Sequence, residues 1–246
     1  MRRIFDPVHG PEYIIRELVM PSLRQVHEDL YAAAEGAALL VSHPLTMAMP
    51  IVAAQRKLPW AASVLAPLSF MSAFDPPLIS GAEWFRGLSA LGPRAYGALF
   101  GLLKLVARPW EAPLRALRAE LGLPPLAGMA LFEGQFSPRL NLGLFDAPLG
   151  APQPDWPAHT LVTGAPLHDG AGGDTRELDA FLAAGEPPIV FALGSSAIWV
   201  AGDAFWQAAA DAARRLGRRA ILVPGAETAQ RLASSLPEGE IGRAHV

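Results

Sequence analysis

The sequence predicts an α/β protein with parallel sheets, because the order strand, polar turn, helix, strand occurs twice along the chain. The clearer copy is residues 187–225, PPIVFALGSSAIWVAGDAFWQAAADAARRLGRRAILVPG, and the other is residues 37–65. In both copies the strands are short apolar runs. Crossovers between parallel strands are right-handed, so the polar turns should lie at the carboxyl edge of each sheet, where open α/β folds bind ligands. We therefore expect two Rossmann-like sheets, each with a candidate site at its edge.

Composition supports a folded chain and excludes several classes of function. Of the 246 residues, 51% are hydrophobic and 17% charged, and the net charge is -3 with no basic block, so no nucleic-acid partner is expected. Cysteine is absent, which excludes disulfides and thiolate metal sites and favours a reducing, cytoplasmic compartment. The six histidines include no pair at helical metal-ligand spacing, so no metal is expected. No apolar run reaches the roughly 20 residues of a membrane span, and the start MRRIFDPVHGPEY lacks the apolar core of a secretory signal.

The first half opens with a helix and continues into the first strand-turn-helix-strand unit. Apolar residues recur at helical spacing before Gly36, with a kink expected at Pro21. A polar turn, Ser42-His43-Pro44-Leu45-Thr46, follows the first strand directly. The predicted elements are a helix at 11–35, a buried strand at 37–41, a helix at 46–57 and a strand at 60–65.

The chain changes character after this unit. Residues 66–80, APLSFMSAFDPPLIS, are too apolar for an ordinary solvated loop, so we expect them to line a cavity or pack on a partner. Helices are expected at 81–91, 93–106 and 110–121. The middle one, PRAYGALFGLLKLVA, is nearly all apolar. A core helix is its first interpretation, and a wall for a lipophilic acceptor or a membrane-surface contact is the alternative.

The rest of the chain is predicted as a proline-rich connection and a second α/β unit. The helix of that unit begins near Asp203 and ends at Gly217, and its first strand is apolar enough to be buried on both faces. Asp174 is a candidate cap for the helix that leads into it. The predicted elements are strands at 140–145, 160–163, 189–193 and 220–223, and a helix at 175–184.

The turn Gly194-Ser195-Ser196 is the strongest candidate for a binding site. Backbone N–H groups and two hydroxyls in such a turn can donate to phosphate oxygens without help from a cation. On spacing alone, a plain strand-to-loop turn is an equal alternative. The nucleophile elbow of an α/β-hydrolase is a weaker one, because Ile198 stands where that motif needs its second glycine.

Four segments resemble the family-one glycosyltransferases of the GT-B fold, especially the bacterial branch that acts on lipids and small natural products. These segments are LLVSHPLT, LAPLSF with SAFDPP, DWP and FALGSSAIW, and the resemblance extends over residues 10–224. In this family the N-terminal Rossmann domain binds the acceptor and the C-terminal one the nucleotide sugar. The resemblance implies transfer of a hexose or deoxyhexose from a nucleoside diphosphate sugar to a hydroxyl of a lipophilic or small-molecule acceptor, without metal or further cofactor. It implies a cytoplasmic protein, with peripheral contact to the inner face of the membrane as an additional option.

The resemblance also implies a GT-B fold with an incomplete N-terminal Rossmann-like domain and the first part of the C-terminal one. The expected parts are an acceptor-binding domain at 1–150, a linker and entry helix at 151–186, the start of the nucleotide-sugar domain at 187–240, and a tail at 241–246. The family's opening strand with its Gly-rich turn and catalytic His, and its later donor segment with a His-x-Gly motif, have no counterpart here. We therefore expect truncation at both ends and weak nucleotide binding, with an inactive α/β fragment or binding remnant as the alternative. The tail, IGRAHV, matches one reading frame of a sequencing-library adapter, so we expect it to be an artefact.

Residue roles follow from the resemblance and from position at the sheet edge. Gly194, Ser195 and Ser196 are expected to lie against the donor diphosphate. His43 is the candidate catalytic base, because an imidazole titrates near neutrality and this one follows a strand directly. Its alternative is a turn residue satisfied by backbone hydrogen bonds. The expected acceptor pocket consists of Ser42, Thr46, Phe70 and Phe74.

Overall fold

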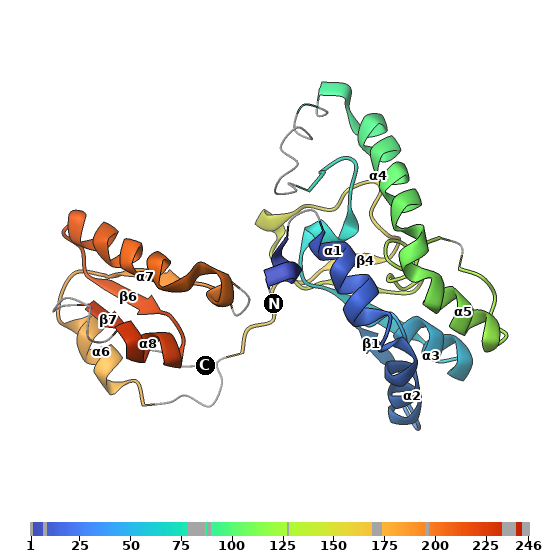
Figure 1. The fold of residues 1–246 in the computed structure, drawn as a ribbon, viewed down its shortest axis with the longest axis horizontal. Helices are drawn as coiled ribbons and strands as arrows, with labels where there is room; N and C mark the ends of the chain where they lie inside the picture. Colours follow the sequence, from blue (N-terminus) through green and yellow to red (C-terminus); the bar gives the residue numbers. More distant parts are fainter. Residues whose placement is uncertain are drawn as a thin grey trace. The chain divides into compact units, whose positions relative to one another are not determined.

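The structure is a computed structural model that describes residues 2–6, 9–77, 87, 90–126, 128–168, 174–194, 197–232 and 240–242. The chain divides into two compact units, Met1–Leu167 and His168–Val246, which Figure 1 shows coloured along the sequence. The division falls inside the segment 151–186 that the sequence marks as a linker.

The first unit contains a four-stranded parallel sheet in which spatial order equals chain order. Its register aligns Ser42 with Ala62, and Ala62 with Asn141. The strands are β1 (Leu40–Ser42), β2 (Trp60–Val64), β3 (Asn141–Gly143) and β4 (Thr160–Val162). All four were predicted, and each is shorter than its apolar run. The fourth strand lies within the linker segment but pairs with β3 as the edge of this sheet.

The helical segments of the first unit occur at positions in the chain close to those expected. The predicted helix at 11–35 is divided at Pro21, where the missing N–H and the ring prevent a continuous ladder. Before the break the backbone widens into a π-helical stretch, and the N–H of Met20 donates to the carbonyl of Ile15 at 2.9 Å. The helix predicted at 81–91 falls almost wholly outside the described residues. The helical segments are η1 (Arg2–Phe5), α1 (Gly10–Tyr13), η2 (Ile14–Val19), α2 (Leu23–Ala33), α3 (Met49–Arg56), η3 (Pro67–Phe70), α4 (Pro93–Ala107), η5 (Arg108–Glu111), α5 (Ala112–Glu120) and η6 (Ala147–Leu149).

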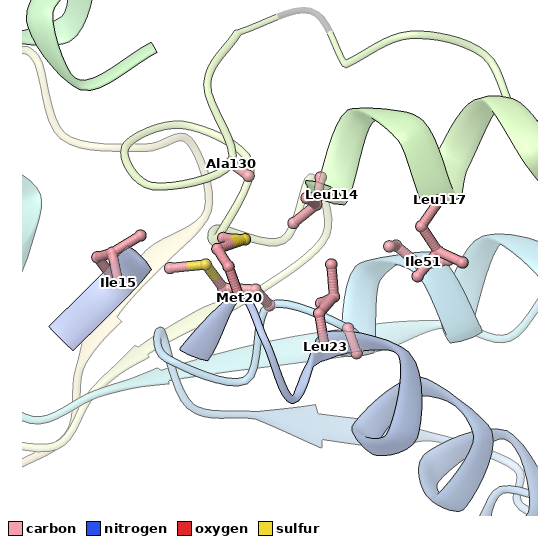
Figure 2. Close-up of a cluster of buried hydrophobic side chains, with 9 residues drawn as sticks. Ile15, Met20, Leu23, Ile51, Leu114, Leu117 and Ala130 are labelled. Carbon is pink, nitrogen blue, oxygen red and sulfur yellow. The ribbon is translucent and has the colours of Figure 1, made fainter. Parts of the chain in front are cut away.

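An apolar cluster connects η2, α2, α3, α5 and the segment after α5 (Figure 2). Leu117 extends from α5 toward Ile51 of α3, Leu114 lies one turn earlier on α5, and each of these three side chains is at most 3% exposed. Burying a side chain of this size stabilises the fold by about 1.5–3 kcal/mol. The cluster fixes α5 and thereby positions the segment that follows it. The labelled members are Ile15, Met20, Leu23, Ile51, Leu114, Leu117 and Ala130.

One face of the first sheet is less covered than the sequence predicted. Val41 is 56% exposed and Leu161 is 57% exposed, and the strand register places both on the same face. The expectation of a fully buried first strand is therefore wrong for Val41. The reason is that α3 packs on the opposite face, where Val52 contacts Leu40 in a buried cluster. Apolar composition alone does not distinguish a strand covered on two faces from one covered on one.

The second unit is a three-stranded parallel sheet, in the order β5-β6-β7. Trp206 is 1% exposed and packs with Leu222 of the central strand. Gly202 has φ 60° and ψ -176°, which interrupts α7, so the regular helix starts at Asp203 as expected. Val190 is 60% exposed, and burial of the first strand on both faces is a wrong prediction at this residue. The elements are α6 (Arg176–Ala183), β5 (Ile189–Ala192), α7 (Ile198–Arg215), β6 (Ala220–Val223), α8 (Ala226–Leu232) and β7 (Glu240–Gly242).

The last strand includes two residues of the tail 241–246, and the remaining four lie outside the described residues. Within the described parts of both units, no helix has the length and apolar character needed to cross a bilayer.

Candidate functional site

The turn after β1 lies at the carboxyl edge of the first sheet, as expected. The carbonyl of His43 accepts the N–H of Thr46 at 2.8 Å and the hydroxyl of Ser42 at 3.2 Å. Ser42 is 3% exposed, and its own carbonyl accepts the hydroxyl of Ser63 on the neighbouring strand at 3.0 Å. The turn is thus closed by its own backbone and anchored to the adjacent strand.

The imidazole of His43 is exposed, and its hydrogen bond selects a tautomer. The N–H of Leu45 donates to Nδ1 at 3.2 Å, so this nitrogen is unprotonated and a neutral ring carries its proton on Nε2. In this tautomer Nε2 is a donor. To accept a proton there, the ring has to adopt the other tautomer and give up its bond to Leu45. The geometry matches the turn-residue alternative, and the catalytic role stays a prediction.

Among the cavities formed by the described residues, none is lined by all four residues expected to form an acceptor pocket. Ser42 and Thr46 border a space of only about 10 Å³, close to the volume that a single water occupies. Phe70 borders a separate cavity of about 350 Å³. Phe74 is 51% exposed and is not among the residues that line either space. Of these two spaces, the one of about 350 Å³ is large enough to accept part of an organic ligand.

Phe70 is positioned by an aromatic cluster behind the carboxyl ends of β2 and β3. Its ring centroid lies 4.3 Å from that of Trp156, 5.4 Å from Phe136 and 6.3 Å from Phe145. Phe70 is 7% exposed and Phe145 is 1% exposed, so the cluster is part of the core. Phe70 therefore serves both as a core residue and as a wall of the 350 Å³ cavity.

The walls of this cavity combine apolar side chains with several polar ones. The loop after β2 contributes Ser69 to Met71, and α4 contributes Phe100 and Lys104. Phe132 and Phe136 line it from the segment after α5, together with Glu133. The expectation that the apolar loop lines a cavity is confirmed for its first half. The core interpretation of α4 holds for Tyr96 and Phe100, which are buried, and the helix also contributes to the cavity wall. Its role as a wall for a lipophilic acceptor stays a prediction.

Asp155 fastens the loop to the segment before β4. Its carboxylate accepts the hydroxyl of Ser72 at 2.6 Å and the N–H of Ala73 at 2.7 Å. The Ser72 oxygen in turn accepts the N–H groups of Phe74 and Asp75, at 3.1 and 3.2 Å. Asp155 and Ala73 both line the 350 Å³ cavity, so this tether sets the shape of one wall.

Lys104 and Glu133 form an ion pair that borders the cavity. Lys104 also lies 5.5 Å from the ring centroid of Phe132, and the second oxygen of Glu133 accepts the N–H of Met129 at 3.0 Å. Burial by itself would raise the pKa of the Glu133 carboxyl, but the hydrogen bonds from Lys104 and Met129 outweigh it and lower the pKa. The carboxylate is therefore charged at neutral pH and holds Lys104 in place.

In the second unit, Gly194 follows β5 at the carboxyl edge of its sheet. Its carbonyl accepts the N–H of Ala197 at 2.9 Å, which closes a turn, and no atom lies within 4 Å of a Cβ built on it. Ser195 and Ser196, predicted to contact the donor diphosphate, lie outside the described residues. The expected position of the glycine at the sheet edge is confirmed, and the role of the loop stays a prediction.

Sequence reasoning missed the polar residues of the 350 Å³ cavity. Lys104 had a signal, because it and Arg94 are the only charged residues in a nearly apolar helix. Glu133 had none, since its partner lies 29 residues away. Asp155 was noticed as part of the word DWP, but nothing in the sequence linked it to Ser72. Among the described residues, no three His, Asp or Glu side chains are grouped so as to hold a metal ion.

Comparison with known proteins finds a curated sequence relative and several solved structures of similar fold. The chain is 31% identical over 211 residues to the O-mycaminosyltylonolide 6-deoxyallosyltransferase of Streptomyces fradiae, covering 84% of this chain and 48% of the relative. It thus spans about half the length of that curated protein. The crystal structure of a glycotransferase of kitacinnamycin superposes with a TM-score of 0.59 at 15% identity, over 100% of this chain and 57% of that one.

No protein-family model matches the chain. The solved structure supports the fold alone, since its sequence identity is low, and the curated relative supports the family. Both agree with the parallel α/β architecture of the two units. The chain belongs to the family-one glycosyltransferases of the GT-B fold.

Proposed function

We propose that the chain takes part in the transfer of a hexose or deoxyhexose from a nucleoside diphosphate sugar to a hydroxyl of a lipophilic or small-molecule acceptor. Its first unit would bind the acceptor, and its second unit would begin the nucleotide-sugar domain. The name of the Streptomyces relative, a 6-deoxyallosyltransferase, supports a deoxyhexose donor and a small-molecule acceptor.

The observation that carries the proposal is the 350 Å³ cavity of the first unit. Its size and its aromatic walls suit part of a lipophilic molecule, and the few polar groups are suited to orienting hydroxyls. Ser69, Lys104, Glu133 and Asp155 are the polar side chains in its lining. The cavity replaces the pocket of Ser42, Thr46, Phe70 and Phe74 as the proposed acceptor site, with Phe70 common to both.

On the donor side, the turn of Gly194, Ser195 and Ser196 would donate backbone and hydroxyl hydrogens to the leaving diphosphate. Fixed dipoles of this kind stabilise developing charge without a metal ion. His43 remains the candidate base within this chain, subject to the change of tautomer described above.

The acceptor site can be tested by filling the cavity from a glycine. Gly97 of α4 lines it, and no atom outside the helix lies within 4 Å of a Cβ built there, so a side chain can start at this position and Gly97→Leu adds volume at the cavity wall. Gly101 lies one turn further along the same helix, has equally open surroundings and is not a lining residue. We expect Gly97→Leu to weaken binding of O-mycaminosyltylonolide at least tenfold by calorimetry, and Gly101→Leu to leave it unchanged.

Equal acceptor affinity in wild type and Gly97→Leu would refute the proposed site. Transfer itself is assayed as nucleoside diphosphate released from uridine or thymidine diphosphate sugars in the presence of acceptor. A chain that binds acceptor but releases no nucleoside diphosphate would support the alternative of a binding part without activity of its own.

A further inference from the structure

A second and larger cavity, of about 720 Å³, lies in the first unit outside the proposed acceptor site. It is bordered by the end of α4, by η5 and α5, and by the segment that follows α5. Four cationic side chains line it: Lys104, Arg108, Arg115 and Arg118. Among the described residues of its lining, Glu133 is the only one with a carboxylate.

Two of these four cations are neutralised by carboxylates. Arg115 pairs with the buried Glu111 at 2.7 Å, and Lys104 pairs with Glu133. Arg108 and Arg118 form no ion pair with any residue in the described part of the chain. The cavity therefore retains two positive charges with no protein counter-charge in its described lining.

Arg118 is the more unusual of the two, because it is only 7% exposed. Its guanidinium donates Nε–H and Nη2–H to one backbone carbonyl, that of Pro124, at 3.2 and 2.7 Å. Burial lowers the pKa of Arg118, and no carboxylate opposes that effect. A buried charge without a partner is costly, and a planar guanidinium is well shaped for two hydrogen bonds to a phosphate or carboxylate.

The rest of the lining is apolar. Leu105, Leu123, Leu126 and Met129 border the same space, and Leu105 is 67% exposed. An inorganic anion would leave these side chains in contact with water. An anion that carries an apolar body would cover them while its head contacts the arginines.

We propose that this cavity binds an organic anion with an apolar body, with its phosphate or carboxylate head held by Arg108 and Arg118. The site is distinct from the proposed acceptor cavity, although Lys104 and Glu133 border both. It does not depend on the proposed sugar transfer, since no co-substrate of that reaction is needed to occupy it.

The test is calorimetric titration of the 246-residue chain with octyl phosphate, octanol and inorganic phosphate. Octyl phosphate should bind most tightly, because it alone supplies both the head and the body. Arg108→Gln and Arg118→Met should each weaken its binding about tenfold, the equivalent of one charge-assisted hydrogen bond. Arg139→Gln removes the same charge from an exposed position outside the cavity and should have no effect.

The thermal transition of Arg118→Met shows whether this variant folds. If it does not, Arg108→Gln still tests the proposal, because Arg108 is exposed. Octyl phosphate that binds no more tightly than octanol, or that binds Arg108→Gln as it binds wild type, would overturn the proposal. Co-sedimentation with phosphatidylglycerol vesicles, lost in Arg108→Gln and absent with phosphatidylcholine, would identify the anion as a membrane lipid. Octyl phosphate binding without co-sedimentation would identify it as a soluble ligand.

Discussion

Replacing Asp155 with alanine should loosen the loop that forms one wall of the 350 Å³ cavity. The carboxylate accepts two hydrogen bonds, from the hydroxyl of Ser72 and from the N–H of Ala73. Ser72 is 3% exposed, so after the substitution its hydroxyl remains buried without this acceptor. The loop then keeps its internal bonds, in which the N–H groups of Phe74 and Asp75 donate to the Ser72 oxygen.

The magnitude follows from these two contacts. Hydrogen bonds to a charged group contribute about 1.5–3 kcal/mol each, and the low end applies because the Asp155 carboxylate is exposed. Asp155→Ala should therefore lower the free energy of unfolding of the first unit by about 2–3 kcal/mol. Asp155→Asn keeps one acceptor oxygen and should lose roughly half as much.

The assay is urea unfolding of wild type and variants, with fluorescence as the readout. Trp156 follows the substituted residue and lies 4.3 Å from Phe70, so the tryptophan signal includes this region. Asp75→Ala is the matched control, because it removes a carboxylate from the same loop. Asp75 bonds to Ser72 through its backbone N–H, which the substitution keeps. This substitution should change the unfolding free energy by less than about 0.5 kcal/mol.

A double-mutant cycle with Ser72→Ala isolates the direct contact. Groups that share a hydrogen bond should be coupled by about 1 kcal/mol or more, so the double variant should cost less than the sum of the two single ones. Additive effects within about 0.3 kcal/mol would refute the tether. An Asp155→Ala variant no less stable than Asp75→Ala would do the same.

Three further predictions test other parts of the structure. Phe70→Ala removes the ring that contacts Phe136, Phe145 and Trp156 and should cost about 3–5 kcal/mol in urea unfolding, so a loss below 1 kcal/mol would contradict the cluster. The pKa of Glu133 is lower in the folded than in the unfolded chain, so its ion pair stabilises the fold above the unfolded value near 4.5, and this stabilisation is lost as pH falls through the folded pKa. Wild type should therefore be more stable than Glu133→Gln by less than about 1 kcal/mol for this exposed pair, and the difference should disappear between pH 5 and 3. A difference that grows on acidification would be inconsistent with this sign. Gly202→Ala should lower the free energy of unfolding by about 1–3 kcal/mol, because a φ of 60° with a ψ of -176° is nearly restricted to glycine. Gly101→Ala, in the exposed middle of α4, should raise it by about 0.5–1 kcal/mol. Thermal unfolding that shows the same sign for both variants would be contrary evidence.

The fold could be predicted from sequence because its strands, turns and caps depend on neighbouring residues. The strand-turn-helix order of residues 187–225 predicted β5, α7 and β6, and Gly202 and Asp203 fixed where the regular helix starts. Pro21 likewise fixed the break between η2 and α2, since a proline acts on the turn that precedes it. The family was evident from short words such as FALGSSAIW, and the Streptomyces relative supports it.

The tertiary structure alone decided which residues share a cavity. Phe70 and Phe74 are four residues apart, yet only Phe70 lines the 350 Å³ space, because it packs on Trp156 from a segment 86 positions away in the chain. The pairing of Lys104 with Glu133 and the burial of Arg118 beside Pro124 have no periodic pattern in the sequence. Local propensity determines where a helix or strand begins, but the distance between two charges depends on how separate segments pack, and that is fixed only when the chain is folded.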